Sequence, residues 1–295
     1  MAIPFILIPI GGFILNEYYQ SKKIKESQKL IELTKETHEK NLKEFNLQRE
    51  NIIKSLDSLE KKRLEILGSF KIFSDLVEKV VDRPRFKKEI KNIDLKLDNL
   101  KLEELKIVSF KSTELLTKIN ETGIISGTLL SQKALLSISS VGTGILGITT
   151  VGIGAIIATN IKTIKVYSDT KKADAFHKEM KEAEKTIKKC CNYFIVLEDV
   201  INNFECCVNK INSAYIFHLD KLQKIVAEKT NFNDFALEEE LVFENTALLV
   251  QLLFNLLKVN FFLEKENEEG LKEINIFDIN RNTYDASSIL SDIKY

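Results

Sequence analysis

Residues 85–295 contain no proline, and the chain of 295 residues has only three, Pro4, Pro9 and Pro84. Proline and glycine normally mark the turns of sandwiches, barrels and α/β folds, so their scarcity argues against all three. The pattern predicts an all-α fold, an elongated bundle of long, coiled-coil-like helices. The length allows one or two domains.

Charged side chains are distributed unevenly along this chain. The 43 basic and 43 acidic residues cancel, so the chain lacks the strongly basic balance of a nucleic-acid-binding domain. Residues 1–16 carry no charge, and residues 124–160 carry only that of Lys133. The sequence therefore predicts charged arms around an apolar centre, with an apolar tip at the N-terminus and no nucleic-acid partner.

A seven-residue repeat runs through residues 24–80, and eight of its nine positions are apolar. The positions are Ile24, Ile31, His38, Phe45, Ile52, Leu59, Ile66, Phe73 and Val80. A second apolar stripe beside it is interrupted by Arg49 and Arg63. This period predicts a long supercoiled helix packed on a partner helix. Pro84 should end it, and a helix over residues 86–121 should fold back along it.

The second half of the chain predicts further helices. Residues 161–228 are expected to form a long helix, and residues 235–263 another, capped by Asn233 and Asp234. Residues 245–257 carry no charge and are interpreted as core. The predicted organisation is an apolar tip (1–19), a two-helix coiled-coil arm (20–121), a glycine-rich segment (122–160), helices completing the bundle (161–263) and an acidic tail with a short helix (264–295).

Residues 134–160 form an uncharged stretch of 27 residues. A membrane-spanning helix needs about 20 apolar residues, so the stretch is long enough for one span. With residues 122–140 included, two shorter helices could instead form a hairpin. The Gly, Ser and Thr content favours lipid over a soluble core, which needs larger side chains, although a buried core helix stays the alternative. The predicted membrane-inserting residues are Ile124, Ile125, Leu129, Leu130, Leu135, Leu136, Ile138, Val141, Ile145, Leu146, Ile148, Val151, Ile153, Ile156 and Ile157.

Small residues recur at helical spacing in the same region. Small side chains every third or fourth position let two helices approach closely in lipid, which predicts that the inserted segment self-associates. The helical arms are expected to form a homo-oligomer or to bind a partner subunit. The residues concerned are Gly123, Gly127, Thr143, Gly147, Thr150, Gly154 and Ala158. Three glycines also match G-x-G-x-x-G, but no alternating strand–helix pattern surrounds them, so a dinucleotide site is not expected.

The N-terminal tip is apolar and is followed by tyrosines and lysines, as suits a membrane interface. We interpret it as an anchor. A segment within the bundle and a marginal, uncleaved export signal are the alternatives. Topology and location before insertion, cytoplasmic or secreted, stay open. The anchor residues are Ile3, Phe5, Ile6, Leu7, Ile8, Ile10, Phe13, Ile14 and Leu15.

Residues capable of chemistry are few. The adjacent pairs Cys190-Cys191 and Cys206-Cys207 lack the spacing of zinc ligands. None of the three histidines has a serine or cysteine nucleophile beside it in the sequence. We therefore expect no enzyme, no metal, no cofactor and no small-molecule substrate.

The order of elements, a long charged helix, a return helix, a glycine-rich apolar segment and another long charged helix, resembles the α-helical pore-forming toxins of the cytolysin A and haemolysin BL type. The resemblance lies in layout and not in a motif. It implies a bacterial, membrane-associated protein whose soluble bundle hides residues 122–160 until it meets a membrane and oligomerises. It also implies that the N-terminal residues 2–19 join the pore. The chain lacks the clear export signal of secreted toxins.

Two other functions fit the same sequence. A constitutively anchored coiled-coil scaffold or signalling protein would use its arms to bind a protein partner. A soluble helical adaptor would bury the glycine-rich segment as core.

Overall fold

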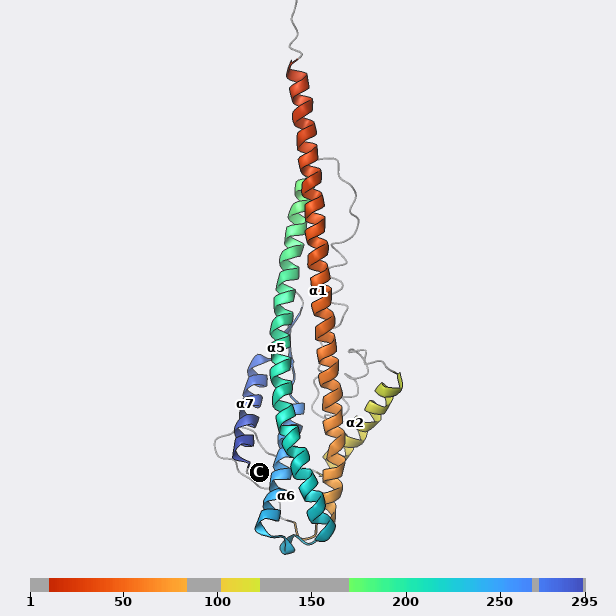
Figure 1. Ribbon diagram of the computed structural model, residues 1–295, viewed down its shortest axis with the longest axis vertical. Coiled ribbons are helices and arrows are strands. Elements are labelled where there is room, and N and C mark those ends of the chain that lie inside the picture. Colours follow the sequence, from red (N-terminus) through yellow and green to blue (C-terminus); the bar gives the residue numbers. More distant parts are fainter. Residues whose placement is uncertain (1–10, 84–101, 123–169, 267–270, 294–295) are drawn as a thin grey trace, which may run out of the picture. The chain divides into compact units, whose positions relative to one another are not determined.

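The computed structural model describes residues 11–83, 102–122, 170–266 and 271–293, of which 88% are helical. The all-α fold class is therefore confirmed. The chain divides into two compact units. The first comprises Met1–Glu50 and Ile153–Phe194, and the second Asn51–Gly152 and Ile195–Tyr295. The long helices α1 and α5 contribute to both units (Figure 1).

Helix α1 spans Gly11–Lys79 and is 69 residues long. Every member of the seven-residue stripe whose side chain is described is buried, from His38 and Phe45 to Phe73 and Val80. The stripe therefore forms a packed face, as its period predicts. Burying one stripe of a charged helix explains why residues with so many lysines and glutamates form an ordered element.

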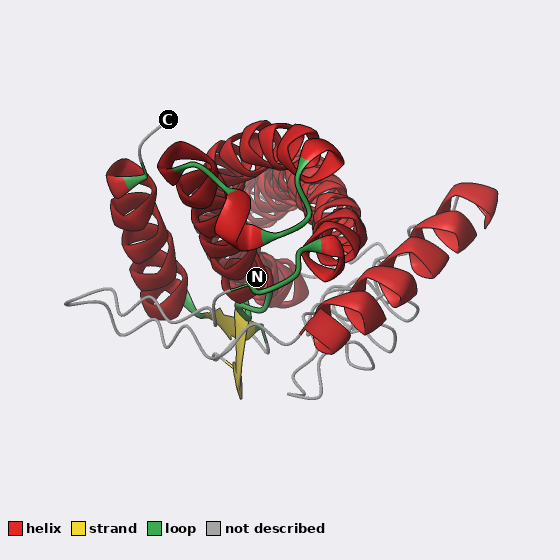
Figure 2. Cartoon of the chain, turned by 90° about the horizontal axis from the view of Figure 1, so that it is seen from below, coloured by secondary structure: helices red, strands yellow, loops and turns green. Residues whose placement is uncertain are grey.

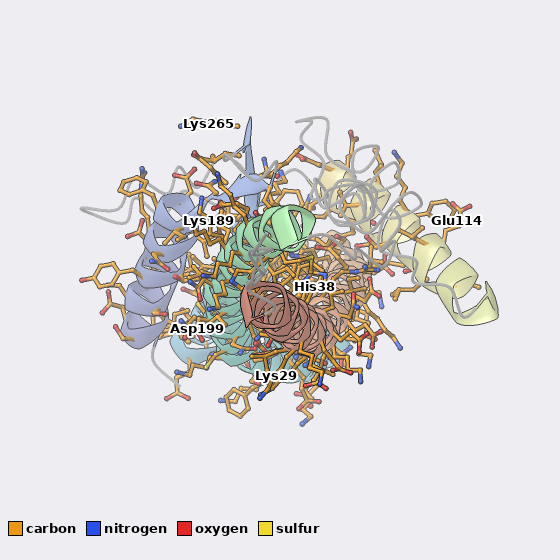
Figure 3. The ribbon with its side chains drawn as sticks, turned by 90° about the horizontal axis from the view of Figure 1, so that it is seen from above. Lys29, His38, Glu114, Lys189, Asp199 and Lys265 are labelled. Carbon is orange, nitrogen blue, oxygen red and sulfur yellow. The ribbon has the colours of Figure 1, made fainter. Side chains whose placement is uncertain are left out.

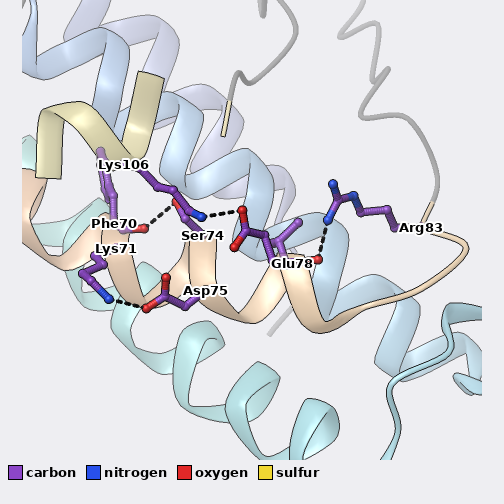
Figure 4. A network of polar contacts seen from close by, with 8 residues as sticks. Phe70, Lys71, Ser74, Asp75, Glu78, Arg83 and Lys106 are labelled. Atoms are coloured by element: carbon purple, nitrogen blue, oxygen red, sulfur yellow. Dashed lines mark hydrogen bonds and ion pairs between the residues drawn. The ribbon is translucent and has the colours of Figure 1, made fainter. Parts of the chain in front are cut away.

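The end of α1 lies just before Pro84, where the sequence predicts it. Asp82 adopts a φ of 57°, in the left-handed region that a continuing helix does not use. Arg83 Nη1 donates to the carbonyl oxygen of Val77 at 2.6 Å and so satisfies one of the last carbonyls of the helix (Figure 4).

Helix α5 spans Thr170–Glu228 and packs on α1 in each unit. In the first unit Thr34 meets His177, and the rings of Phe45 and Phe194 lie 5.6 Å apart. In the second unit Tyr215 donates to the carbonyl oxygen of Ser69 at 3.3 Å. The Thr34–His177 pair is 143 residues apart in sequence and the Ser69–Tyr215 pair 146.

This nearly constant offset means that α1 and α5 run in the same direction in both units. At the C-terminal end of the pair, Val81 and Asn231 form a parallel β-bridge. The Val81 amide donates to the Thr230 carbonyl at 2.7 Å, and the Phe232 amide donates to the Val81 carbonyl at 3.0 Å. In the second unit the two helices therefore end side by side.

Helix α2 spans Leu102–Thr122. It packs antiparallel to α1, with Lys106 paired to Glu78 (Figure 4) and Ser109 Oγ donating to the Leu67 carbonyl at 2.7 Å. The helices approach closely at Gly68, where an added Cβ would lie 3.2 Å from Oγ1 of Thr113. Of the helix that the sequence predicts over residues 86–121, residues 86–101 lie outside the described residues.

Helix α6, Leu237–Leu257, supplies much of the core of the second unit. Residues 245–250 are all buried, which agrees with their interpretation as core. The predicted cap is wrong: Asn233 and Asp234 lie in a 3-10 helix, Phe232–Asp234, because the Asn231 side chain accepts from the Asn233 amide. Instead, the Glu239 carboxylate accepts a hydrogen bond from the backbone amide of Ala236, the residue that precedes α6.

Helix α6 ends before residue 263, the limit that the sequence predicts, and two strands that the sequence does not predict precede a short helix. Strands β1, Phe262–Glu266, and β2, Lys272–Ile274, pair antiparallel with an irregular register. Helix α7, Ile276–Asp292, then packs with Ile279, Ala286 and Ile289 buried. Figure 2 shows the strands beside the helices, with α2 and α7 on opposite sides of the second unit.

We predict that Phe70→Ala destabilises the protein by about 3–4 kcal/mol. Phe70 is fully buried, and its ring contacts those of Tyr215 and Phe254 edge to face. Urea denaturation followed by circular dichroism measures the loss. The control, Ile72→Ala, changes a side chain that is 44% exposed and should cost well under half as much. Equal losses for the two variants would contradict this placement of the core.

Candidate functional site

The residues that the sequence predicts to insert into a membrane, Ile124 to Ile157, lie outside the described residues. The small residues from Gly123 to Ala158 lie outside them as well. Of the predicted anchor, only Phe13, Ile14 and Leu15 fall within the described range, in the first turns of α1. These sites therefore stay predictions.

Within the described part of the second unit, the most unusual chemistry is a buried ion pair on α1. Arg63 Nη1 lies 3.1 Å from Glu60 Oε1, and the two residues are 1% and 5% exposed. They are three positions apart, so they lie on the same helix face. Charged side chains are seldom buried to this extent in a protein core.

Two aromatic rings and a backbone carbonyl hold the guanidinium in place. Its central carbon lies 5.2 Å from the ring centroids of both Phe204 on α5 and Phe261, the residue before β1. Arg63 Nη2 donates to the carbonyl oxygen of Val259 at 3.2 Å. Cation–π attraction at this distance is strongest when water is excluded. Arg63 thus joins α1 to α5 and to the segment between α6 and β1.

Burial opposes the charges of this pair. Desolvation raises the pKa of Glu60, and the attraction and hydrogen bond of Arg63 lower it less strongly. Desolvation likewise lowers the pKa of Arg63. Among the described residues, Glu60 Oε2 and Arg63 Nε find no hydrogen-bond partner. A buried pair of this kind fixes how elements pack more than it adds to stability, and removing one partner is strongly destabilising.

Asp57, one turn before Glu60, completes the acidic side of the cluster. Desolvation, followed by repulsion from Glu60, raises the pKa of Asp57 from 3.8 to about 6. The cluster joins three segments of the second unit through Arg63. Its chemistry is that of a latch between helices, and we call residues 57, 60 and 63 with Phe204 and Phe261 the Arg63 latch.

Sequence reasoning did not predict this latch. Arg63 stands out because it interrupts the second apolar stripe, but the pattern alone did not show that it is buried. Glu60 was missed entirely. The available signal is its position three residues before Arg63 on a helix whose neighbouring positions, Leu59 and Leu64, are apolar.

The cysteines and histidines form no metal site. No group of three or more His, Cys, Asp or Glu residues in the part of the chain that the structure describes could hold a metal ion. Cys190 and Cys207 are buried, whereas Cys206 is exposed. Burial raises the pKa of the Cys207 thiol, which also contacts Ser287 Oγ at 3.5 Å. A raised pKa favours the unreactive thiol over the thiolate.

In the described ranges, α6 alone is long and apolar enough to cross a membrane. Its most apolar window is 67% buried inside the protein. A core helix passes the same test of length and composition, so α6 carries no argument for a membrane.

Comparisons with known proteins give no relative: no family model, no curated protein and no solved structure matches this chain.

We predict that Arg63→Met lowers the free energy of unfolding by about 3 kcal/mol, because it leaves the Glu60 carboxylate buried without its partner. The double variant Glu60→Met/Arg63→Met should lose less than Arg63→Met alone. Lys71→Met, which removes an exposed ion pair with Asp75, is the control and should lose less than 1 kcal/mol. Urea titration of all three variants checks the order. A double variant less stable than Arg63→Met would refute the latch as described.

We also predict that Asp57→Asn stabilises the protein at pH 7.5 by about 1 kcal/mol, a figure discounted because the carboxylate is partly solvated. The pKa of Asp57 is higher in the folded state, so its ionisation opposes folding above pH 6 and this penalty fades as the pH falls. The gain should therefore be smaller at pH 5.0. Urea midpoints at the two pH values measure it. A stability gain that is larger at pH 5.0 than at pH 7.5 would contradict a raised pKa of Asp57 in the folded state.

Proposed function

We propose that this chain is a membrane-inserting α-helical protein of pore-forming type. The observation that carries the proposal is the uncharged stretch of 27 residues at positions 134–160, set between helices rich in charge. In this proposal the soluble bundle holds residues 122–160 until a trigger releases them, after which they enter the bilayer and pack with other protomers.

The composition of the described core supports the proposal. Its largest fully buried apolar side chains are phenylalanines, leucines and a tyrosine, and only three alanines, Ala214, Ala247 and Ala286, are among its buried apolar residues. Residues 134–160 instead hold five glycines, with serines and threonines. Small side chains fill little volume in a soluble core but let helices approach closely in lipid. The stretch is thus unlike the core that this same protein builds.

The helices on either side of the stretch are suited to water. Helix α2 ends at Thr122 and has exposed glutamates at positions 103 and 114. Helix α5 begins at Thr170, and its early turns carry exposed lysines such as Lys178, Lys181 and Lys185. Charged residues are costly at the bilayer centre. These helices would therefore stay in water or at the membrane surface while the apolar stretch inserts.

The energetics require a trigger. Moving an apolar helix into lipid is favourable by roughly 25 cal/mol for each Å² of apolar surface removed from water. Against this gain stands the cost of opening the bundle, including any movement of the packed faces described above. In a protein that is stable in water and inserts only at a membrane, the free energy gained by insertion and the cost of opening the bundle must be nearly equal.

We predict that the protein, purified without detergent, floats with liposomes and releases an entrapped dye. The variant Gly147→Leu/Gly154→Leu should release dye at a rate at least about tenfold lower, because leucine at small-residue positions keeps helices apart. Gly152→Leu, the same change five positions after Gly147 and so away from the helix face that Gly147 and Gly154 would share, is the matched control and should behave as the wild type.

The outcomes separate the candidate functions. Unchanged release by the double leucine variant would count against packing through small residues. Flotation without release would overturn the pore-forming proposal in favour of a constitutively anchored coiled-coil scaffold. If the protein neither floats with liposomes nor releases dye at any pH and lipid composition tried, the result would favour a soluble adaptor.

A further inference from the structure

The interface between α1 and α5 in the first unit contains a buried histidine. His38 occupies the seven-residue stripe of α1 and is 8% exposed. Its neighbours on the stripe are apolar, and the next member, Phe45, packs against Phe194 of α5. Figure 3 looks along the helices with His38 labelled. An ionisable ring therefore stands where the packing pattern calls for an apolar side chain.

The polar groups around His38 do little to hold a charge there. Its Nδ1 atom makes no hydrogen bond within the described residues. One turn earlier, Thr34 Oγ1 donates to the Leu30 carbonyl at 2.7 Å and lies 3.0 Å from Nδ1 of His177, so both groups are engaged with each other. The charged groups that act electrostatically on His38 are Glu184 from α5 and Glu39 on its own helix.

The balance of these effects favours neutral imidazole. Desolvation is the largest effect and lowers the pKa of His38 below its ordinary 6.5, while Glu184 and then Glu39 raise it by less. In the separated helices the ring regains water and titrates near 6.5. The His38 contribution to packing is therefore complete above pH 6.5 and is lost as the pH falls through the lower pKa of the folded state.

We propose that protonation of His38 loosens the packing of α1 on α5 in the first unit, which makes mild acid a signal that opens this part of the bundle. The proton comes from solvent and goes to a ring nitrogen, and no other bond changes. The inference rests on the proposed function only in that it names a trigger for it. We call the packing of residues 30–50 on residues 177–194 around His38 the joint. Its sensitivity to acid does not depend on whether the protein enters membranes.

Hydrogen–deuterium exchange of the full-length protein in the absence of lipid tests the joint directly. Exchange rates at pH 7.5 and 5.0 are corrected for the pH dependence of intrinsic exchange. In the wild type, the corrected exchange rates of peptides from residues 30–50 and 177–194 should be roughly tenfold higher at pH 5.0 than at pH 7.5. No acid-induced increase in these peptides would overturn the inference without recourse to any variant.

Two variants identify the responsible group. His38→Gln keeps a polar side chain that cannot titrate, and His38→Leu restores the apolar pattern of the stripe. Both should abolish the acid-induced increase in the first unit. His218→Gln is the matched control, because His218 is a buried histidine of the second unit whose pKa is also lowered, by desolvation and then by Lys221. It should leave the acid response of residues 30–50 intact, and an undiminished response in both His38 variants would overturn the assignment.

Dye release from liposomes at the same two pH values distinguishes this inference from the proposed function. If exchange increases in acid but no dye is released at either pH, the result supports the acid sensitivity of the joint and contradicts the pore-forming proposal. Release that is equal at both pH values, together with exchange that does not respond to acid, supports pore formation and overturns the joint.

Discussion

The parallel packing of α1 on α5 is the interaction on which the rest of the described structure depends. Its contacts keep a nearly constant sequence offset, 143 residues at Thr34–His177 and 146 at Ser69–Tyr215. Parallel neighbours cannot be joined by a short turn, and residues 80–169 separate the two helices in the sequence. Helix α2 lies within that segment and packs on α1 in the second unit, and α6 and α7 cover further apolar surface there.

Both units place ionisable groups in this packed surface, but in different ways. In the second unit the charge of Arg63 is kept, because Glu60, two aromatic rings and a carbonyl surround it. In the first unit His38 has no comparable set of partners, and burial favours its neutral form. A surrounded charge fixes geometry at nearly every physiological pH, whereas a titrating ring makes the packing depend on pH. Asp57 adds a pH dependence of opposite sign to the second unit.

The sequence predicts the helices of this fold better than their partners. The stripe through Phe45 and Phe73 indicates a long buried face, and Pro84 indicates where α1 ends, because both signals are local. The direction of α5 is not encoded in any local pattern, since a buried stripe packs against a parallel or an antiparallel neighbour alike. Strands β1 and β2 were missed because five and three residues are too few for a period to show.

The Arg63 latch depends on Phe204 and Phe261, which only the folded chain brings to it. The membrane segment itself lies outside the described residues, so its part in the candidate site rests on sequence alone.

The parallel pairing also has a consequence for synthesis of the chain. Residues of α1 leave the ribosome roughly 145 positions ahead of the α5 residues that cover them. At 5–20 residues per second, the apolar stripe of α1 waits roughly 7–30 s for its partner. Throughout that interval a helix with Phe45, Phe70 and Phe73 on one face is exposed to other nascent chains. The architecture thus gives this protein a period of vulnerability during translation in which chaperones, or a second copy of α1, compete with α5 for the same surface.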